Sequence, residues 1–232
     1  MISLENRWAL VTGSSRGIGQ QIALGLAALK CNIIVHGREI SHLDETLKEL
    51  EKYGIKTHVV YGELSTVNGV DSIIEGVHKG PGSVDILYNN AAIQNKWKPI
   101  WEISNKEWLE TFQINFFSVV TLCNTFAAKM KKRGFGRIIN LTSGIKDVPQ
   151  LSPYSVSKAS IDKYSQDLAF ELKGTNVLVN YLDPGWLRTD LGGPNGMFDV
   201  ETVIPGALVP ALLEDNGPSG RLFSAQDFKY LK

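Results

Sequence analysis

The sequence ALVTGSSRGIGQQIA, residues 9–23, runs from an apolar stretch through a glycine-rich turn into a helical pattern. Gly13, Gly17 and Gly19 give the spacing G-x-x-x-G-x-G. Small residues at such a turn let the backbone approach a pyrophosphate, whose negative charge is favoured at the amino terminus of a helix. The stretch therefore predicts a strand, a phosphate-binding turn and a helix, which together open a dinucleotide-binding fold.

Short apolar runs alternate with longer helical patterns along the rest of the chain. Several runs are apolar almost throughout, which is typical of strands covered on both faces. This alternation implies βαβ crossovers and a parallel sheet. We predict one α/β domain over residues 1–232, a Rossmann-type doubly wound parallel sheet with helices on both faces. The expected strands are residues 8–12, 33–36, 57–61, 84–88, 137–141, 177–182 and an edge strand at 219–224, and the expected helices are residues 17–30, 41–53, 66–79, 105–132 and 152–173.

The composition of the 232 residues argues against several classes of protein. Lys+Arg and Asp+Glu are equal at 24 each, so the overall charge favours neither nucleic acid nor an anionic membrane. No apolar run approaches the length of a membrane span, and residues 1–13 lack a secretory pattern. Cys31 and Cys123 are expected to be reduced thiols. We expect a cytoplasmic protein with a small-molecule substrate, no nucleic-acid or membrane partner and no metal site.

Residues 13–17, Gly-Ser-Ser-Arg-Gly, also match the G-x-S-x-G turn that carries the nucleophile of α/β-hydrolases. In that fold a histidine follows the serine, usually far along the chain. No histidine occurs beyond residue 78, and the four present are His36, His42, His58 and His78. The phosphate-binding turn is therefore preferred, and a hydrolase is a distant alternative.

The end of the second expected strand bears on the choice of cofactor. A dinucleotide fold usually has an acidic residue about 20 positions beyond the glycines, which binds the ribose 2′-hydroxyl of NAD. Between Gln20 and Gly37 there is no acidic residue, and Arg38 stands where the acid is expected. Arginine makes planar, charge-assisted contacts to phosphate, and Arg16 offers a second cation. The sequence thus favours NADP(H) over NAD(H), with Glu39 able to bind ribose or to pair with a neighbouring base.

The stretch SPYSVSK, residues 152–158, places Tyr154 and Lys158 four positions apart. Ser152 and Pro153 fit the N-cap and first position of a helix, which puts Tyr154 in its first turn. The helix dipole and a cation about 5 Å away both favour the phenolate, the cation by roughly 3 kcal/mol at an effective dielectric near 20. Burial acts in the opposite direction. We expect a tyrosine that is usable as an acid or base near neutral pH.

Six motifs occur in order along the chain: TGSSRGIG (12–19), NNAA (89–92), Asn115 within FQINFFS (112–118), INLTSG (139–144), YSVSK (154–158) and DPGWLRTD (183–190). In these motifs the chain resembles the short-chain dehydrogenase/reductase family over essentially its whole length. Its C-terminal part is similar to carbonyl-reductase-like members. The resemblance implies an oxidoreductase that interconverts a ketone or aldehyde and an alcohol by hydride transfer.

The same resemblance implies roles for four catalytic residues. Tyr154 would exchange a proton with the substrate oxygen, and Ser143 would hydrogen-bond that oxygen. Lys158 would hold the nicotinamide ribose and lower the pKa of Tyr154, while Asn115 would anchor a water that relays protons to the lysine. The implied cofactor-binding residues are Gly13, Ser15, Arg16, Gly17, Ile18, Gly19, Arg38, Leu64, Asn90, Ala91, Tyr154, Lys158, Pro184, Gly185, Leu187 and Thr189.

The chain departs from the family pattern near the substrate. Ser143 precedes Tyr154 by only eleven residues, which predicts a reshaped substrate opening, and Glu63 replaces an aspartate commonly found near adenine. Residues 190–204 resemble the substrate loop and suit a moderately apolar ketone or aldehyde. Further candidates for the substrate pocket are Trp97, Gln150, Trp186, Met197 and Phe198.

The family resemblance also implies a homodimer or homotetramer packed through residues 105–132 and 152–173. Two alternatives for function stay open. One is a non-catalytic NADP(H)-binding redox sensor, and the other, within the family, is a 3-oxoacyl-carrier-protein reductase.

Overall fold

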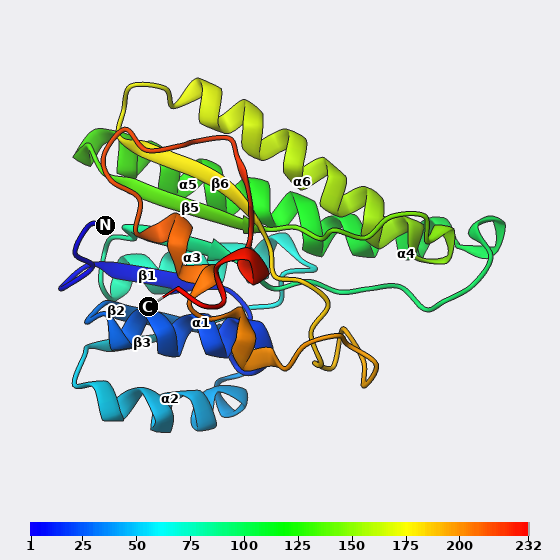
Figure 1. The fold of residues 1–232 in the computed structure, drawn as a ribbon, viewed down its shortest axis with the longest axis horizontal. Coiled ribbons are helices and arrows are strands. Elements are labelled where there is room, and N and C mark those ends of the chain that lie inside the picture. The colour runs from blue at the N-terminus through cyan, green and yellow to red at the C-terminus, as the bar shows by residue number, and fades with distance from the viewer. Residues whose placement is uncertain (232) are drawn as a thin grey trace.

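Seven parallel strands form one sheet at the centre of the molecule, in the order β3-β2-β1-β4-β5-β6-β7 (Figure 1). The computed structural model describes residues 1–231, so Lys232, the last residue of the predicted domain, lies outside the described residues. The predicted α/β fold is confirmed, including the edge strand β7. The strands are β1 (Trp8–Val11), β2 (Asn32–Gly37), β3 (Thr57–Tyr61), β4 (Ile86–Asn89), β5 (Gly136–Leu141), β6 (Val177–Asp183) and β7 (Leu222–Ser224).

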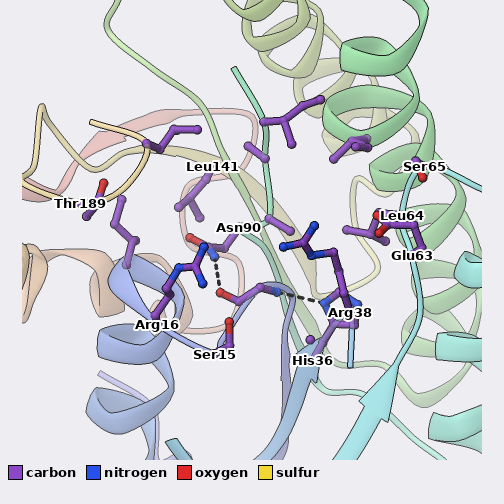
Figure 2. Close-up of a pocket in the computed structure, with 18 of the residues that line it drawn as sticks. Ser15, Arg16, His36, Arg38, Glu63, Leu64, Ser65, Asn90, Leu141 and Thr189 are labelled. Carbon is purple, nitrogen blue, oxygen red and sulfur yellow. Dashed lines mark hydrogen bonds between the residues drawn. The ribbon is translucent and has the colours of Figure 1, made fainter. Parts of the chain in front are cut away.

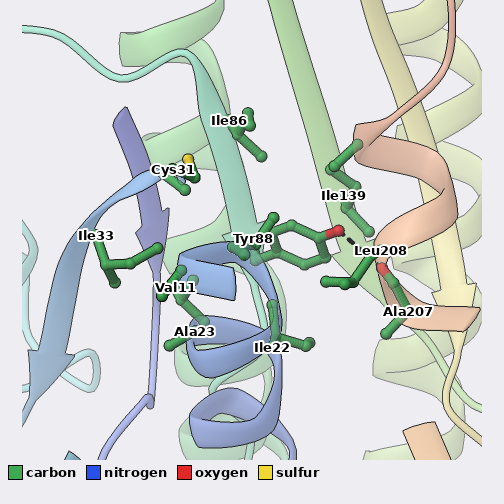
Figure 3. Packing of buried hydrophobic residues seen from close by; sticks show 14 of the residues in the cluster. Val11, Ile22, Ala23, Cys31, Ile33, Ile86, Tyr88, Ile139, Ala207 and Leu208 are labelled. Carbon is green, nitrogen blue, oxygen red and sulfur yellow. Dashed lines mark hydrogen bonds between the residues drawn. The ribbon is translucent and has the colours of Figure 1, made fainter. Parts of the chain in front are cut away.

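Helices cover both faces of the sheet (Figure 1). The helices are α1 (Gly17–Ala28), α2 (Asp44–Leu50), α3 (Val67–Lys79), α4 (Asn105–Phe112), α5 (Ser118–Arg133) and α6 (Ser152–Glu171). On one face α1 and the 3₁₀ segment Gly206–Ala211 pack around Tyr88, whose hydroxyl donates to the carbonyl of Ala207 at 2.7 Å (Figure 3). Helix α2 adds Leu50 to the same core. The other face is covered by α3, α5 and α6. Within residues 1–231, no helix combines the length and apolarity needed to cross a membrane.

Successive residues of a central strand serve the two faces alternately, as the pleat of a strand requires. In β1, Ala9 and Val11 belong to the core under α1, whereas Leu10 belongs to the core under α3 and α5. Because both faces are apolar, the strand is apolar throughout. The apolar runs in the sequence therefore predicted the strands to within a few residues.

Two helix predictions need correction. The predicted helix at 105–132 is divided into α4 and α5 by a π-helical turn, Gln113–Phe117. Ser152 is not an N-cap: the 3₁₀ turn Pro149–Leu151 precedes α6, Leu151 occupies the cap, and the Ser152 hydroxyl donates to the carbonyl of Pro149 at 2.8 Å. The cap lies one residue upstream because the 3₁₀ turn runs directly into α6, which gives Ser152 itself helical backbone angles (φ −53°, ψ −46°).

His36, near the end of β2, fixes the glycine turn that follows β1. The amide of Gly13 donates to its Nδ1 at 3.0 Å, and its Nε2 lies 3.1 Å from the carbonyl oxygen of Gly62. The Ser14 hydroxyl accepts from the amide of His36 at 2.9 Å. A carbonyl can only accept, so Nε2 carries the proton and Nδ1 accepts. Burial lowers the pKa of His36 to about 4, which keeps the ring neutral at physiological pH.

The buried neutral His36 predicts an acid-sensitive fold. An unfolded histidine has a pKa of about 6.5, so between pH 6.5 and pH 4 the unfolded state binds a proton at His36 that the native state does not bind. The stability from His36 is complete above pH 6.5 and falls as the pH drops toward 4. Between pH 7.5 and pH 5 we expect this residue to cost about 2 kcal/mol of unfolding free energy, measured by urea denaturation.

The comparison variants separate His36 from other titrating groups. His36→Gln has no titrating group at this position. Between pH 7.5 and pH 5 its unfolding free energy should therefore fall by about 2 kcal/mol less than that of the wild type. His42→Gln, at an exposed position, should keep the wild-type pH dependence. Equal losses in wild type and His36→Gln would contradict the assignment.

Candidate active site

Two adjoining cavities contain most of the predicted site residues. The first, of about 440 Å³, is lined by residues that follow β1, β2, β3 and β4. The second, of about 840 Å³, is lined by residues that follow β5 and β6 and by residues 191–195. Both are lined by Ile18, Thr142, Tyr154, Pro184, Thr189 and Leu191. Tyr154 therefore lies where the two cavities meet.

The glycine turn brings backbone to the floor of the smaller cavity. Gly13 and Gly17 have φ of +63° and +60°, a region that favours glycine. A Cβ on Gly19 would lie 2.2 Å from the carbonyl oxygen of Gly13, so only glycine fits there. Helix α1 begins at Gly17, and no side chain caps its first amides. These amides are hydrogen-bond donors at the positive end of a helix, next to the cavity.

Two residues hold this turn against β4. The Thr12 hydroxyl accepts from the amides of Asn90 and Ala91 at 2.9 and 3.1 Å. The side chain of Asn90 donates to the carbonyl of Thr12 at 2.8 Å and to that of Gly13 at 3.1 Å, the second of which is drawn in Figure 2. Asn90 was predicted as a cofactor residue, whereas the role of Thr12 was missed. Its only sequence signal is a polar residue at the end of an apolar strand.

Arg16 and Arg38 lie on either side of the smaller cavity, above Ser15 (Figure 2). Arg16 Nε lies 2.7 Å from a carboxylate oxygen of Asp190, and both side chains are exposed. Within residues 1–231, no ion pair includes Arg38. The cavity thus has two cations from different strand ends, one of which is held by an exposed carboxylate.

Acidic residues near the end of β2 and β3 differ in placement. Glu63 and the predicted Leu64 line the smaller cavity. Glu39 does not line it and lies 3.9 Å from His42 Nε2. Glu39 was expected either to bind ribose or to pair with a basic side chain, and the structure places it near the basic side chain of His42.

Tyr154, Ser143 and Lys158 converge near the junction of the cavities. Tyr154 lies in the first turn of α6 and is buried. Lys158, one turn further on, donates from Nζ to the carbonyl of Leu141 at 2.8 Å and lies 5.8 Å from the Tyr154 ring centre. Ser143 follows β5 and lines the larger cavity. The shortened segment between Ser143 and Tyr154 still brings both into one site.

The electrostatics of this site differ from expectation. Burial raises the pKa of Tyr154, the charge of Asp183 raises it further, and a hydrogen bond with Ser143 lowers it. The prediction that Lys158 and the helix dipole bring this pKa toward neutrality is wrong for these protein groups, because burial dominates. Burial also lowers the pKa of Lys158 to about 8, opposed by the charge of Asp162.

Asn115 lies in the π-helical turn and lines neither cavity within residues 1–231. Its Oδ1 accepts from the amide of Ile93 at 2.9 Å. Its Nδ2 donates to the carbonyl of Ile93 at 2.9 Å and to the hydroxyl of Ser157 at 3.0 Å. Because Ser157 precedes Lys158, Asn115 ties the loop after β4 to the helix that carries Tyr154 and Lys158.

Most of the remaining predicted residues line one or both cavities. Gly185, Leu187, Trp97 and Trp186 line the larger cavity, while Pro184 and Thr189 line both. Among the residues that the structure describes, Gln150, Met197 and Phe198 line neither. Phe198 instead packs against the core beneath α1. Of the predicted substrate-pocket residues, the exposed Trp97 and Trp186 therefore line the larger cavity.

Comparison with known proteins adds to this geometry. A profile of the short chain dehydrogenase family matches residues 7–197. The chain is 34% identical over 186 residues to the uncharacterized oxidoreductase YvrD of Bacillus subtilis, covering 79% of this chain and 70% of that protein. It is 34% identical over 194 residues to the 3-oxoacyl-(acyl-carrier-protein) reductase FabG of Aquifex aeolicus, covering 82% and 77%.

A solved structure shares the fold over nearly the whole chain. The crystal structure of a 3-oxoacyl (acyl-carrier-protein) reductase from Agrobacterium tumefaciens with NADP bound matches with a TM-score of 0.86 and 26% identity. It covers 96% of this chain and 93% of the reductase. The matched profile spans the glycine turn and every residue of the Tyr154 site, and on that ground the chain belongs to the short-chain dehydrogenase family of oxidoreductases, which act on CH–OH and C=O groups.

Proposed function

We propose that this chain is an NADP(H)-dependent oxidoreductase that interconverts a ketone or aldehyde and the corresponding alcohol. One observation carries the proposal: Tyr154 lines both cavities, so its hydroxyl can serve a substrate in one cavity beside a cofactor in the other. The family supports a nicotinamide cofactor, and the relative of known structure binds NADP.

The smaller cavity fits a dinucleotide. Gly19 lets the start of α1 lie against the carbonyl of Gly13, and the uncapped first amides of α1 supply donors for a pyrophosphate. Lys158 and Thr189 line the same cavity further along, where the nicotinamide end would be held. Once bound, the nicotinamide supplies or takes up the hydride.

The chain's own groups would handle the proton. Because burial keeps Tyr154 protonated at neutral pH, its hydroxyl suits the donation of a proton to a carbonyl oxygen during reduction. The Ser143 hydroxyl would donate a second hydrogen bond to that oxygen. With a pKa of about 8, Lys158 is mostly charged at pH 7 and would bind ribose hydroxyls while favouring the phenolate left on Tyr154.

Arg38 and Arg16 support a preference for NADP(H). A 2′-phosphate at the edge of the cavity would receive charge-assisted hydrogen bonds from Arg38, which no carboxylate within residues 1–231 pairs. Arg16 would have to exchange Asp190 for the phosphate. Arg38 is therefore the stronger candidate for cofactor discrimination.

We also propose self-association through α4, α5 and α6, as the family resemblance implies. These helices expose large apolar side chains, including Leu109 on α4, Phe117 just before α5 and Phe170 on α6. Scattered apolar residues are normal on a surface, but several on adjoining helices favour an interface.

Tyr154→Phe tests the catalytic role. The change removes the proton donor and leaves the ring, so kcat should fall by about 10²–10⁴-fold while the Kd for NADPH stays close to the wild-type value. Turnover is followed at the nicotinamide absorbance with a panel of ketones and aldehydes. Tyr164→Phe, on the same helix and outside both cavities, is the matched control. Full activity of Tyr154→Phe would refute the role, and absence of turnover in the wild type would favour the sensor.

Arg38→Asp tests the cofactor preference. Replacing the guanidinium with a carboxylate repels a 2′-phosphate and offers an acceptor to a 2′-hydroxyl, so the NADPH-to-NADH ratio of kcat/KM should fall by roughly 10–100-fold. The same reversal of charge at Arg221, an exposed residue beside β7, should leave the ratio unchanged. An unaltered ratio in Arg38→Asp would show that Arg38 does not read the phosphate.

Leu109→Asp tests the interface. A carboxylate buried between subunits is costly, so this variant should shift the mass measured by light scattering toward the monomer. Ile40→Asp, exposed on the short 3₁₀ segment before α2, should keep the wild-type mass. A monomeric wild type would overturn the proposed association.

A further inference from the structure

The larger cavity has a charge distribution that the proposed reaction does not use. Its charged lining residues among 1–231 are Lys146 and Asp183. Asp183 ends β6, directly before Pro184, and lines only this cavity. It therefore lies on the substrate side of Tyr154.

The carboxylate of Asp183 is held in a fixed orientation. Its Oδ1 accepts from the amide of Gly185 at 3.0 Å. A Cβ on Gly144 would lie 2.6 Å from its Oδ2, so the carboxylate packs against the glycine that follows Ser143. Only glycine at 144 leaves room for this arrangement.

The second oxygen of this carboxylate is an available acceptor. Among residues 1–231 the hydrogen bonds of Asp183 include one to Oδ1 and none to Oδ2, and no ion pair includes Asp183. Its charge reaches Tyr154: burial is the main cause of the raised pKa of this residue, and the charge of Asp183 raises it further. An ionised carboxylate accepts hydrogen bonds and cannot donate them.

This position is unfavourable for the reduction of a plain ketone. Hydride transfer builds negative charge on the substrate oxygen, beside Tyr154 and Ser143, and a nearby carboxylate opposes that charge. A hydrogen-bond donor on the substrate, placed against Oδ2, would offset the repulsion and satisfy the acceptor. The carboxylate thus selects for substrates that bring such a donor.

Resting on the function proposed above, we propose that Asp183 is a specificity-determining residue that binds a hydroxyl or ammonium group next to the reacting carbon. The substrate class is then a hydroxy or amino ketone, or the vicinal diol or amino alcohol formed from it. Trp97 and Trp186, both partly exposed on the same cavity, would pack against the rest of the molecule.

The test uses four compounds that differ only beside the carbonyl: 1-phenylethanone and its 2-hydroxy, 2-amino and 2-methoxy derivatives. The methoxy compound retains the oxygen but has no donor. With NADPH, kcat/KM of the wild type should be at least about 10-fold higher for the hydroxy or amino compound than for the methoxy compound. The better of the two identifies whether a hydroxyl or an ammonium is the group recognised.

Asp183→Asn is the decisive variant. The amide oxygen can still accept from Gly185, so the turn is retained while the charge is lost. The ratio of kcat/KM between the donor compound and the methoxy compound should fall by roughly 10-fold. Asp227→Asn, which removes the same charge outside both cavities, should keep the wild-type ratio.

An equal kcat/KM ratio of donor to methoxy compound in wild type and Asp183→Asn would overturn the proposal. A change in rate shared by all four compounds would also overturn it, because the effect would then act through Tyr154 or the cofactor. If none of the four is reduced, calorimetric binding to the NADP⁺ complex of the enzyme decides. Tighter binding of a donor compound, lost in Asp183→Asn, supports the assignment, and equal binding of all four refutes it. Failure of the proposed function itself would appear separately, as an absence of NADPH oxidation with any carbonyl compound.

Discussion

The turn between β1 and α1 is the constraint on which the rest of the site depends. Its backbone is held by neutral His36 from β2 and by Asn90 beyond β4. These contacts join the carboxyl ends of three adjacent strands, at the point where the strand order reverses between β1 and β4. Ligands bind at such switch points in doubly wound sheets. The uncharged state of one buried histidine therefore contributes to the shape of the smaller cavity.

The sequence predicted the strands well because a pleated strand that is covered on both faces has to be apolar at successive residues. Val11 and Leu10 face different cores, and both have to be apolar. The ends of helices were harder to predict. Ser152 is a residue type that often caps a helix, but the preceding 3₁₀ turn, which no local pattern predicts, already gives it a helical backbone.

The sequence predicted which residues come together at the site better than it predicted their pKa values. Spacing alone placed Tyr154 and Lys158 on one face of a helix, and the structure brings Ser143 to the same junction. The direction of the Tyr154 pKa depends on burial and on Asp183, which lies 29 positions away in the chain. Neither burial nor a distant charge can be read from the spacing of two residues. His36 and Thr12 were missed for the same reason, since their partners come from other strands.

The raised pKa of Tyr154 bears on the role of Lys158 in the proposed reaction. A tyrosine with a raised pKa is protonated at neutral pH but is a weaker acid, so its proton donation depends on stabilising the phenolate left in the buried site. In the proposed reaction Lys158 would supply that stabilisation. A buried Lys158, with Asp162 favouring its charged form, would stabilise that phenolate more strongly than an exposed lysine would. Asp183 acts in the opposite direction on the same tyrosine. In the proposed reaction, the balance between Lys158, which lines the smaller cavity, and Asp183, which lines the larger one, would determine how readily Tyr154 gives up its proton. It would also determine which substrates can offset the charge of the carboxylate.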